Sequence, residues 1–304
     1  MTGIFDDLRN AFRKSNNGLI QIIFVNILVF LVLILSKVIF TLSGYSDIFN
    51  TFTNKLSLPA SFNSLIFQPW SIFTYFFSHI DFFHILFNML FLYWFGGLVH
   101  EYLGNRRFIN IYILGGLVGG LFYMIAYNLI PYFGPIINSS WMLGASGATY
   151  AIVFAAATLL PDYTFMLLFI GPVRIKYIAL FYLIISIAST VGSNAGGNIA
   201  HLGGALIGYL YIIQLRKGVD LAAPFNAVFD FVRSLFVEIP AKPQMKVTHR
   251  SYSNAGYSKT TQYTADDAPD ESEVDELLDK ISKSGYESLT KDEKLRLFKA
   301  SQKN

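Results

Sequence analysis

Long apolar stretches dominate this sequence and constrain its fold more than any motif does. We place six of them, at residues 19–42, 80–99, 107–130, 144–160, 174–192 and 197–215. A bilayer-spanning helix needs roughly 20 apolar residues, and a chain with 53% hydrophobic and 14% charged residues is too apolar for soluble domains. The first stretch exceeds the apolar core of a signal peptide, and no A-x-A cleavage site follows it, so we expect it to be retained. The sequence therefore predicts an all-α, polytopic membrane protein in a lipid bilayer.

Short-loop charges predict how these spans are oriented. Lys and Arg gather in loops on the cytoplasmic side of a membrane. With a cytoplasmic N-terminus, the inner loops hold Arg106, Arg107, Arg174, Lys176, Arg216 and Lys217. The outer loops 131–143 and 193–196 hold no Lys or Arg, and the outward exceptions are Lys37 and Lys55. We therefore expect both termini to be cytoplasmic.

The segments around the spans predict four parts. Residues 1–18 form a cytosolic N-terminal segment and residues 19–216 the membrane domain. Within the membrane domain, residues 43–79 are too broken to span and too apolar to float freely, which predicts a loop lying in the interface. Residues 217–271 combine an amphipathic segment with a polar linker that we expect to be disordered. Residues 272–304 predict a small cytosolic helical hairpin, with a break at Gly285 and a capping box formed by Thr290 and Glu293.

A serine and a histidine stand near the starts of two of these spans. Ser146 opens the fourth apolar stretch, and His201 lies near the start of the sixth. Both spans run from outside to inside, and at ~1.5 Å rise per residue the two side chains lie within about one turn of the same depth. Imidazole is the usual base that activates a serine, so this pair is a candidate nucleophile and base. Taken alone, the serine is more simply a structural hydrogen-bond donor, whereas the histidine fits a proton relay or a metal ligand as well as it fits catalysis.

Small residues predict close packing of the helices that carry this pair. Glycine and alanine recur every four residues in the pattern that lets membrane helices approach closely. The glycines that we assign to helix packing near the pair are Gly144, Gly147, Gly204 and Gly208. We expect a tight bundle around a short fourth span.

The second span adds polar groups near the same outer end. His84 and Asn88 lie one helical turn apart on one face. Attack on a carbonyl creates an oxyanion that needs fixed donors in a dry site. The Asn88 amide, the His84 imidazole and the backbone N–H of Ser146 are the candidates. The alternative is a structural hydrogen bond that holds the loop, a role that fits His79 better.

Several function classes are disfavoured by composition. The chain has no cysteine, so thiol catalysis and cysteine-based metal sites are excluded. Its five histidines are scattered and form no HExxH motif, so we expect neither a metal nor a cofactor. A net charge of +3 gives no indication of a nucleic-acid partner.

These motifs together resemble those of the rhomboid family of intramembrane serine proteases. The family's GxSG motif resembles residues 144–147, its AHxxGxxxG motif resembles residues 200–208, and its HxxxN motif is similar to residues 84–88. Trp70 lies where a Trp-Arg pair introduces the second span in the family, but Ser71 replaces the arginine. In the family, that arginine is associated with the structure of the outer loop. Its replacement by Ser71 therefore affects the expected fold or lipid contact of the loop more than the expected chemistry.

The resemblance implies a six-span bundle and a rhomboid-type serine endopeptidase. Ser146 and His201 would form a catalytic dyad that cuts peptide bonds in or near transmembrane helices of membrane-protein substrates, with Tyr150 supporting the imidazole by stacking. No Asp or Glu lies in spans four to six to serve as a third member. The expected location is a bacterial cytoplasmic (inner) membrane, with the active site facing outward.

Two other functions fit parts of the sequence. The first is a catalytically silent rhomboid-like protein that binds transmembrane clients without cutting them, against which the retention of Ser146 and His201 argues. The second is a solute or proton transporter, for which intramembrane histidines are typical. Against the transporter, no broken half-helices or inverted repeats are apparent, and the polar groups cluster at one end of the bundle.

Overall fold

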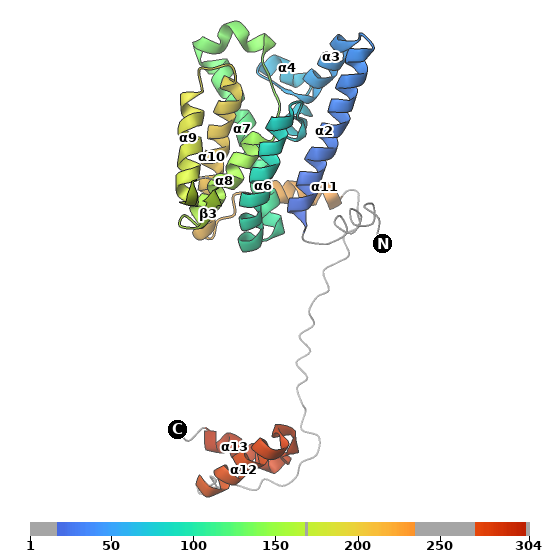
Figure 1. Cartoon of the computed structure of the whole chain (residues 1–304). Helices are drawn as coiled ribbons and strands as arrows, with labels where there is room; N and C mark the ends of the chain where they lie inside the picture. Colours follow the sequence, from blue (N-terminus) through green and yellow to red (C-terminus); the bar gives the residue numbers. More distant parts are fainter. Residues whose placement is uncertain (1–16, 168–169, 235–270, 302–304) are drawn as a thin grey trace. The chain divides into compact units, whose positions relative to one another are not determined.

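A computed structural model describes residues 17–167, 170–234 and 271–301 of the chain (Figure 1). The chain divides into two compact units, Met1–Ile239 and Pro240–Asn304. Most of the expected N-terminal segment 1–18 and of the expected disordered linker lies outside the described residues.

In the described part of the first unit, four helices are long and apolar enough to cross a membrane. They are α2 (Gly18–Leu42), α6 (Phe82–Leu103), α7 (Asn105–Leu129) and α10 (Ala195–Arg216). Two shorter apolar helices, α8 (Ser146–Leu159) and α9 (Ile175–Ala188), have 14 residues each. Fourteen residues rise only ~21 Å, against ~30 Å for the hydrocarbon core. The helical membrane bundle is confirmed, whereas a count of six spans stays a prediction.

Helix α8 lies inside the bundle, with α6, α7, α9 and α10 packed around it (Figure 1). Four of its alanines are fully buried, Ala148, Ala151, Ala155 and Ala156. A Cβ added to Gly204 of α10 would lie 2.0 Å from the Gly147 carbonyl oxygen, and one on Gly208 would lie 2.1 Å from that of Ala151. The backbones of α8 and α10 therefore touch directly. Only glycine fits at these two positions of α10.

Gly144 does not belong to this packing, contrary to our assignment. It lies before the first residue of α8 and has a φ of +131°. A Cβ there would lie 2.4 Å from Cε1 of His84, so the residue allows a turn against an imidazole rather than a helix contact.

The segment between α2 and α6 contains short helices where we expected a loop. These are α3 (Ser46–Leu56), α4 (Phe62–Ile66), α5 (Ser71–Thr74) and the 3-10 turn η1 (Tyr75–Phe77). Strand β1 (Leu58–Pro59) pairs antiparallel with β2 (Trp141–Met142), which lies just before α8. The 3-10 helix η2 (Pro131–Ser139) leads from α7 into β2. The β1–β2 pair therefore ties this segment to the turn that carries Ser146.

Three side chains hold this segment together at the end of α3. The last carbonyls of a helix have no partners within it. The Gln68 amide donates to the carbonyls of Asn54 (3.3 Å) and Ser57 (3.2 Å). The Trp70 indole donates to the Lys55 carbonyl (2.8 Å), and Thr74 donates to that of Leu56 (2.8 Å). Ser71 is fully buried, and its hydroxyl has no hydrogen-bond partner among the described residues.

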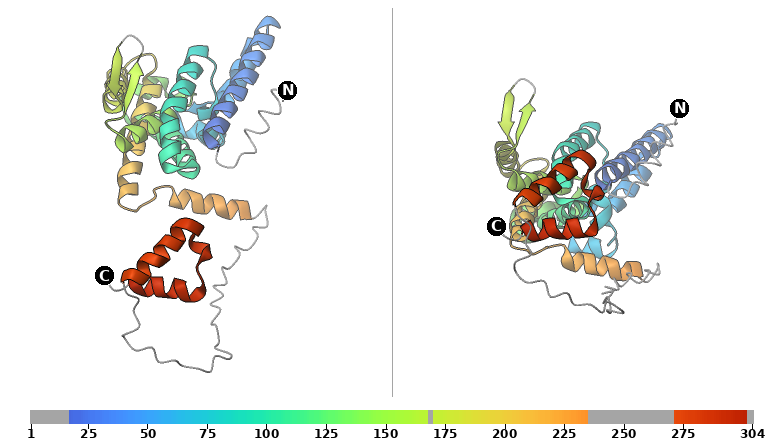
Figure 2. Two further views of the ribbon diagram at one scale, coloured as in Figure 1. Left: turned by 60° about the horizontal axis from the view of Figure 1, so that its bottom comes forward. Right: turned by 90° about the horizontal axis from the view of Figure 1, so that it is seen from below.

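An antiparallel hairpin that we did not predict joins α8 to α9. It consists of β3 (Thr164–Leu167) and β4 (Gly171–Arg174), and it projects from the edge of the bundle (Figure 2). Lys176 (2.7 Å) and Arg174 (3.2 Å) both pair with Asp162 at its base. The hydrogen bond and charge of Lys176, with the charge of Arg174, lower the pKa of Asp162. After α10, helix α11 (Ala223–Ser234) completes the described part of this unit.

The second unit contains two helices where the sequence predicts a hairpin. They are α12 (Glu271–Ser284) and α13 (Lys291–Ser301), with the 3-10 turn η3 (Tyr286–Ser288) between them. Gly285 follows α12 with a φ of +77°. The predicted capping box is present: Glu293 N–H donates to Thr290 Oγ1 (3.3 Å), and Thr290 N–H donates to Glu293 Oε2 (2.7 Å). Lys280 also donates to Glu293, and these bonds lower the pKa of that carboxyl to about 2.

The backbone contact between α8 and α10 predicts opposite effects for two Gly→Ala substitutions. Gly208→Ala should destabilise the protein by about 1–3 kcal/mol or more, because the added Cβ collides with backbone that has no room to move. Gly97→Ala, in α6, places its Cβ where no atom lies within 4 Å. It should be neutral or stabilise by up to about 1 kcal/mol through helix propensity. Thermal unfolding in one detergent measures both, and equal melting temperatures would contradict the proposed packing.

Candidate active site

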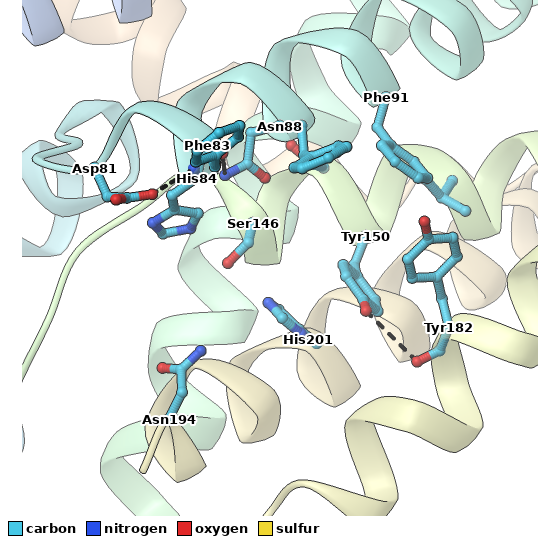
Figure 3. A pocket seen from close by; sticks show the side chains of 13 residues that line it. Asp81, Phe83, His84, Asn88, Phe91, Ser146, Tyr150, Tyr182, Asn194 and His201 are labelled. Atoms are coloured by element: carbon cyan, nitrogen blue, oxygen red, sulfur yellow. Dashed lines mark hydrogen bonds between the residues drawn. The ribbon is translucent and has the colours of Figure 1, made fainter.

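A cavity of about 480 Å³ lies at the end of the bundle where α8 and α10 begin. It collects side chains from α8 and α9, and from α6 and α10 with the residue before each (Figure 3). Its lining residues are Asp81, Phe83, His84, Phe87, Asn88, Phe91, Ser146, Thr149, Tyr150, Val153, Tyr182, Asn194 and His201. Four of the residues to which we assigned chemistry, together with Tyr150, therefore meet in one cavity.

Ser146 is the first residue of α8, and a fixed turn presents it. The Gly144 N–H donates to the Tyr75 carbonyl (2.9 Å), and the Ala145 N–H donates to Nε2 of His79 (3.1 Å). The first N–H groups of a helix lack partners within it and carry the positive end of its dipole. The Ser146 backbone N–H is such a group.

His79 has the structural role that we preferred for it. The imidazole is fully buried, and its Nε2 accepts the Ala145 N–H. A backbone N–H can only donate, so Nε2 carries no proton. His79 therefore holds the turn before Ser146 as a neutral ring.

Asn88 uses its amide hydrogens within the protein. Its Nδ2 donates to the His84 carbonyl (2.9 Å) and lies 3.2 Å from Nε2 of His79. Because His79 Nε2 is an acceptor, Asn88 donates to both partners. Sequence reasoning placed Asn88 near the site but missed this second bond. The Asp81 carboxylate accepts the backbone N–H of His84 (2.8 Å) and thereby caps α6.

His201 is held by two neighbours. The Tyr150 ring stacks on the imidazole, with centroids 4.0 Å apart and planes inclined by 10°. Ser186 of α9 lies at the edge of the imidazole ring. Its Oγ is 3.2 Å from Nδ1 of His201 and 2.9 Å from the Tyr150 hydroxyl. Sequence reasoning missed Ser186. Its signal was a lone serine late in a largely apolar helix.

Ser146 and His201 both line the cavity (Figure 3). Within the described residues, no hydrogen bond joins their side chains. Catalytic hydrogen bonds are often long in structures without substrate. Within those residues, no group of three His, Asp or Glu side chains is placed to hold a metal ion.

Comparisons with known proteins place this site in a family context. The family model of the Rhomboid domain matches residues 67–218, which are 152 of the 304 residues. A family of unknown function (DUF6576) matches residues 257–303.

Individual relatives agree with the first of these matches. The chain is 34% identical over 153 residues to "RHOMBOID-like protein 12, mitochondrial" of Arabidopsis thaliana, covering 47% of this chain and 45% of the relative. It is 35% identical over 89 residues to "Rhomboid protease GlpG" of Salmonella newport (strain SL254), covering 29% of this chain and 28% of the relative. The chain thus spans less than half of the length of either relative.

The matched region contains every residue that lines the cavity. It also contains three of the four helices that are long and apolar enough to cross a membrane. Because the Rhomboid match covers half of the chain and the whole of the site, this integral membrane protein belongs to the rhomboid family.

Proposed function

We propose that the protein is an intramembrane serine endopeptidase that uses Ser146 as its nucleophile and His201 as its base. The observation that carries the proposal is that both side chains line one cavity, with the imidazole held between a stacked tyrosine and a serine hydroxyl. Family membership and the similarity to a rhomboid protease support the same reaction.

The first step would form an acyl-enzyme. Ser146 Oγ attacks the carbonyl carbon of a peptide bond while Nε2 of His201 takes the hydroxyl proton. The tetrahedral intermediate collapses when the C–N bond breaks and His201 passes that proton to the leaving amine. Water then attacks the acyl-enzyme with His201 again as base, which releases the new carboxyl group and restores Ser146.

The oxyanion would form beside three donors. The Ser146 backbone N–H points out of the start of α8, and the side chains of His84 and Asn88 line the same cavity. Asn88 donates to His79 when the site is empty. To donate to the oxyanion, the Asn88 amide must release its bond to His79. Its stabilisation of the developing negative charge is therefore complete only in the transition state.

Transmembrane helices would be the substrates, and they would enter from the lipid. Phe83 and Phe87 of α6 are 62% and 55% exposed and line the cavity at its apolar rim. A helical peptide bond is shielded by its own hydrogen bonds and must unwind before attack. Segments with Gly, Pro or other poor helix formers near the scissile bond should therefore be preferred.

The proposed orientation puts the cavity at the outer face of a bacterial cytoplasmic membrane. Arg106, Arg174 and Arg216 lie near helix ends opposite to the ends that carry the cavity. Positive residues favour the cytoplasmic side, so six spans with cytoplasmic termini give this arrangement.

Cleavage in liposomes by the full-length protein tests the nucleophile and the base. We expect a single-span substrate with a Gly-containing outer segment to be cut by the natural protein, and Ser146→Ala and His201→Ala to abolish cutting. A fluorophosphonate probe should label the natural protein but not Ser146→Ala. Ser139→Ala, an exposed serine of η2, is the matched control and should keep full activity. If the probe does not label the natural protein and the substrate is bound but not cut, the catalytically silent, client-binding alternative holds instead.

Asn88→Ala tests the oxyanion donor. Removing one such donor typically lowers kcat by about 10²–10³-fold. Because Asn88 bonds the oxyanion only after the His79 bond is released, KM should change little. Steady-state kinetics in one liposome preparation measure both constants, with Asn63→Ala, an exposed position of α4, as control. A variant with unchanged kcat would remove Asn88 from the oxyanion site.

A further inference from the structure

The polar groups behind His201 form a directed chain of hydrogen bonds. The Tyr150 hydroxyl donates to the Tyr182 backbone carbonyl (3.5 Å), which can only accept. The Tyr150 oxygen then accepts the Ser186 hydroxyl proton (2.9 Å). With its proton directed to Tyr150, Ser186 Oγ is left as an acceptor for Nδ1 of His201 (3.2 Å). This direction of the chain corresponds to the tautomer with the imidazole proton on Nδ1.

This direction matters for the base. With the proton on Nδ1, Nε2 has a free lone pair and can accept the proton of Ser146. If the chain ran the other way, Ser186 would donate to Nδ1, and Nε2 would carry a proton and could not act as base. In soluble serine proteases an aspartate fixes this tautomer. Here no Asp or Glu occurs between Asp162 and Asp220, a stretch that includes the whole of α9 and α10.

The surroundings of Ser186 fit a fixed role. Its side chain is fully buried, and it is absent from the cavity lining, so it lies behind the imidazole and out of reach of a substrate. Tyr150 restrains the ring face by stacking, while Ser186 restrains the ring edge at Nδ1. The two contacts restrict both tilt and rotation of the ring.

We propose that Ser186 is a positioning residue that holds His201 in the Nδ1–H tautomer and so completes a neutral Ser146–His201–Ser186 triad. The inference rests on the proposed protease function for its catalytic consequence. A neutral acceptor orients the imidazole but does not offset the charge of the imidazolium as an aspartate does. Ser186 should therefore contribute less to the rate than the aspartate of a soluble triad.

Kinetics of three variants in liposomes give the first test. Ser186→Ala should lower kcat by about 10- to 100-fold, the range expected for losing a buried hydrogen bond at the base. KM should stay within about twofold, because Ser186 touches no substrate. Ser186→Thr keeps the hydroxyl and should recover most of the rate. Ser189→Ala, the residue after the last one of α9, is the matched control and should equal the natural protein.

Stability separates positioning from a merely structural role. The melting temperature of each variant is measured in the same detergent. A loss of kcat in Ser186→Ala with a melting temperature close to that of Ser189→Ala supports the proposal. Activity of Ser186→Ala equal to that of the natural protein, or a loss that Ser186→Thr does not recover in a stable variant, overturns it.

Nitrogen NMR of the imidazoles gives a second test that needs no activity. The full-length protein is labelled with ¹⁵N-histidine, and His201→Gln identifies the His201 signals among the five histidines. The natural protein should show a protonated Nδ1 and an unprotonated Nε2 at neutral pH. Ser186→Ala should shift or mix the two tautomers. A protonated Nε2 in the natural protein refutes the inference, even if cleavage is observed, whereas absence of cleavage with the expected tautomer refutes only the protease function.

Discussion

Direct backbone contact between α8 and α10 is the interaction on which the rest of the structure depends. Gly204 and Gly208 leave room for the carbonyls of Gly147 and Ala151, and Gly115 of α7 leaves similar room for Ala151 from another side. Between helices in lipid there is no hydrophobic driving force, so close van der Waals packing must stabilise the association. The same contact brings the starts of α8 and α10 together. A larger residue at Gly204 would separate the helices and, with them, Ser146 and His201.

A second constraint concerns the polar groups of the site, several of which bond one another, although the buried Thr149 Oγ1 and His79 Nδ1 have no partner among the described residues. An unpaired polar group costs several kcal/mol in an apolar medium. His79, Asn88, Ser186 and Tyr150 are each bonded within the protein, and the ion pairs around Asp162 lie in a loop at the opposite end of α8. The side chains that hold His201 and the turn before Ser146 are neutral, and the carboxylate in the lining, Asp81, caps α6. The Ser146 backbone N–H is fixed before a substrate arrives, which is the condition under which electrostatic stabilisation of an oxyanion is strongest, whereas Asn88 must first release His79.

The sequence predicts the features that follow from residue periodicity and from the similar depth of Ser146 and His201 along their two helices. The long helices, the small-residue packing at Gly204 and Gly208 and the capping box at Thr290 all depend on local patterns. The helices of segment 46–77 and the β3–β4 hairpin were missed because tertiary contacts decide them. Ser186 was missed for a different reason. A lone serine in a largely apolar helix has the same sequence pattern whether its hydroxyl bonds its own backbone or a neighbouring helix. Only the rotation of α9 about its axis decides which of these two bonds forms.

The loop after α2 shows how one substitution in a motif is accommodated. The family's arginine after Trp70 is replaced by Ser71, which is buried and makes no bond within the described residues. The carbonyls at the end of α3 are nevertheless capped by Gln68, Trp70 and Thr74. The η1 turn comes directly after them, and there the Tyr75 carbonyl accepts the N–H of Gly144 at the turn before Ser146. The loop is therefore connected to the turn before Ser146 by a backbone hydrogen bond. The Gln68 amide, the Trp70 indole and the Thr74 hydroxyl fix the loop without a buried charge.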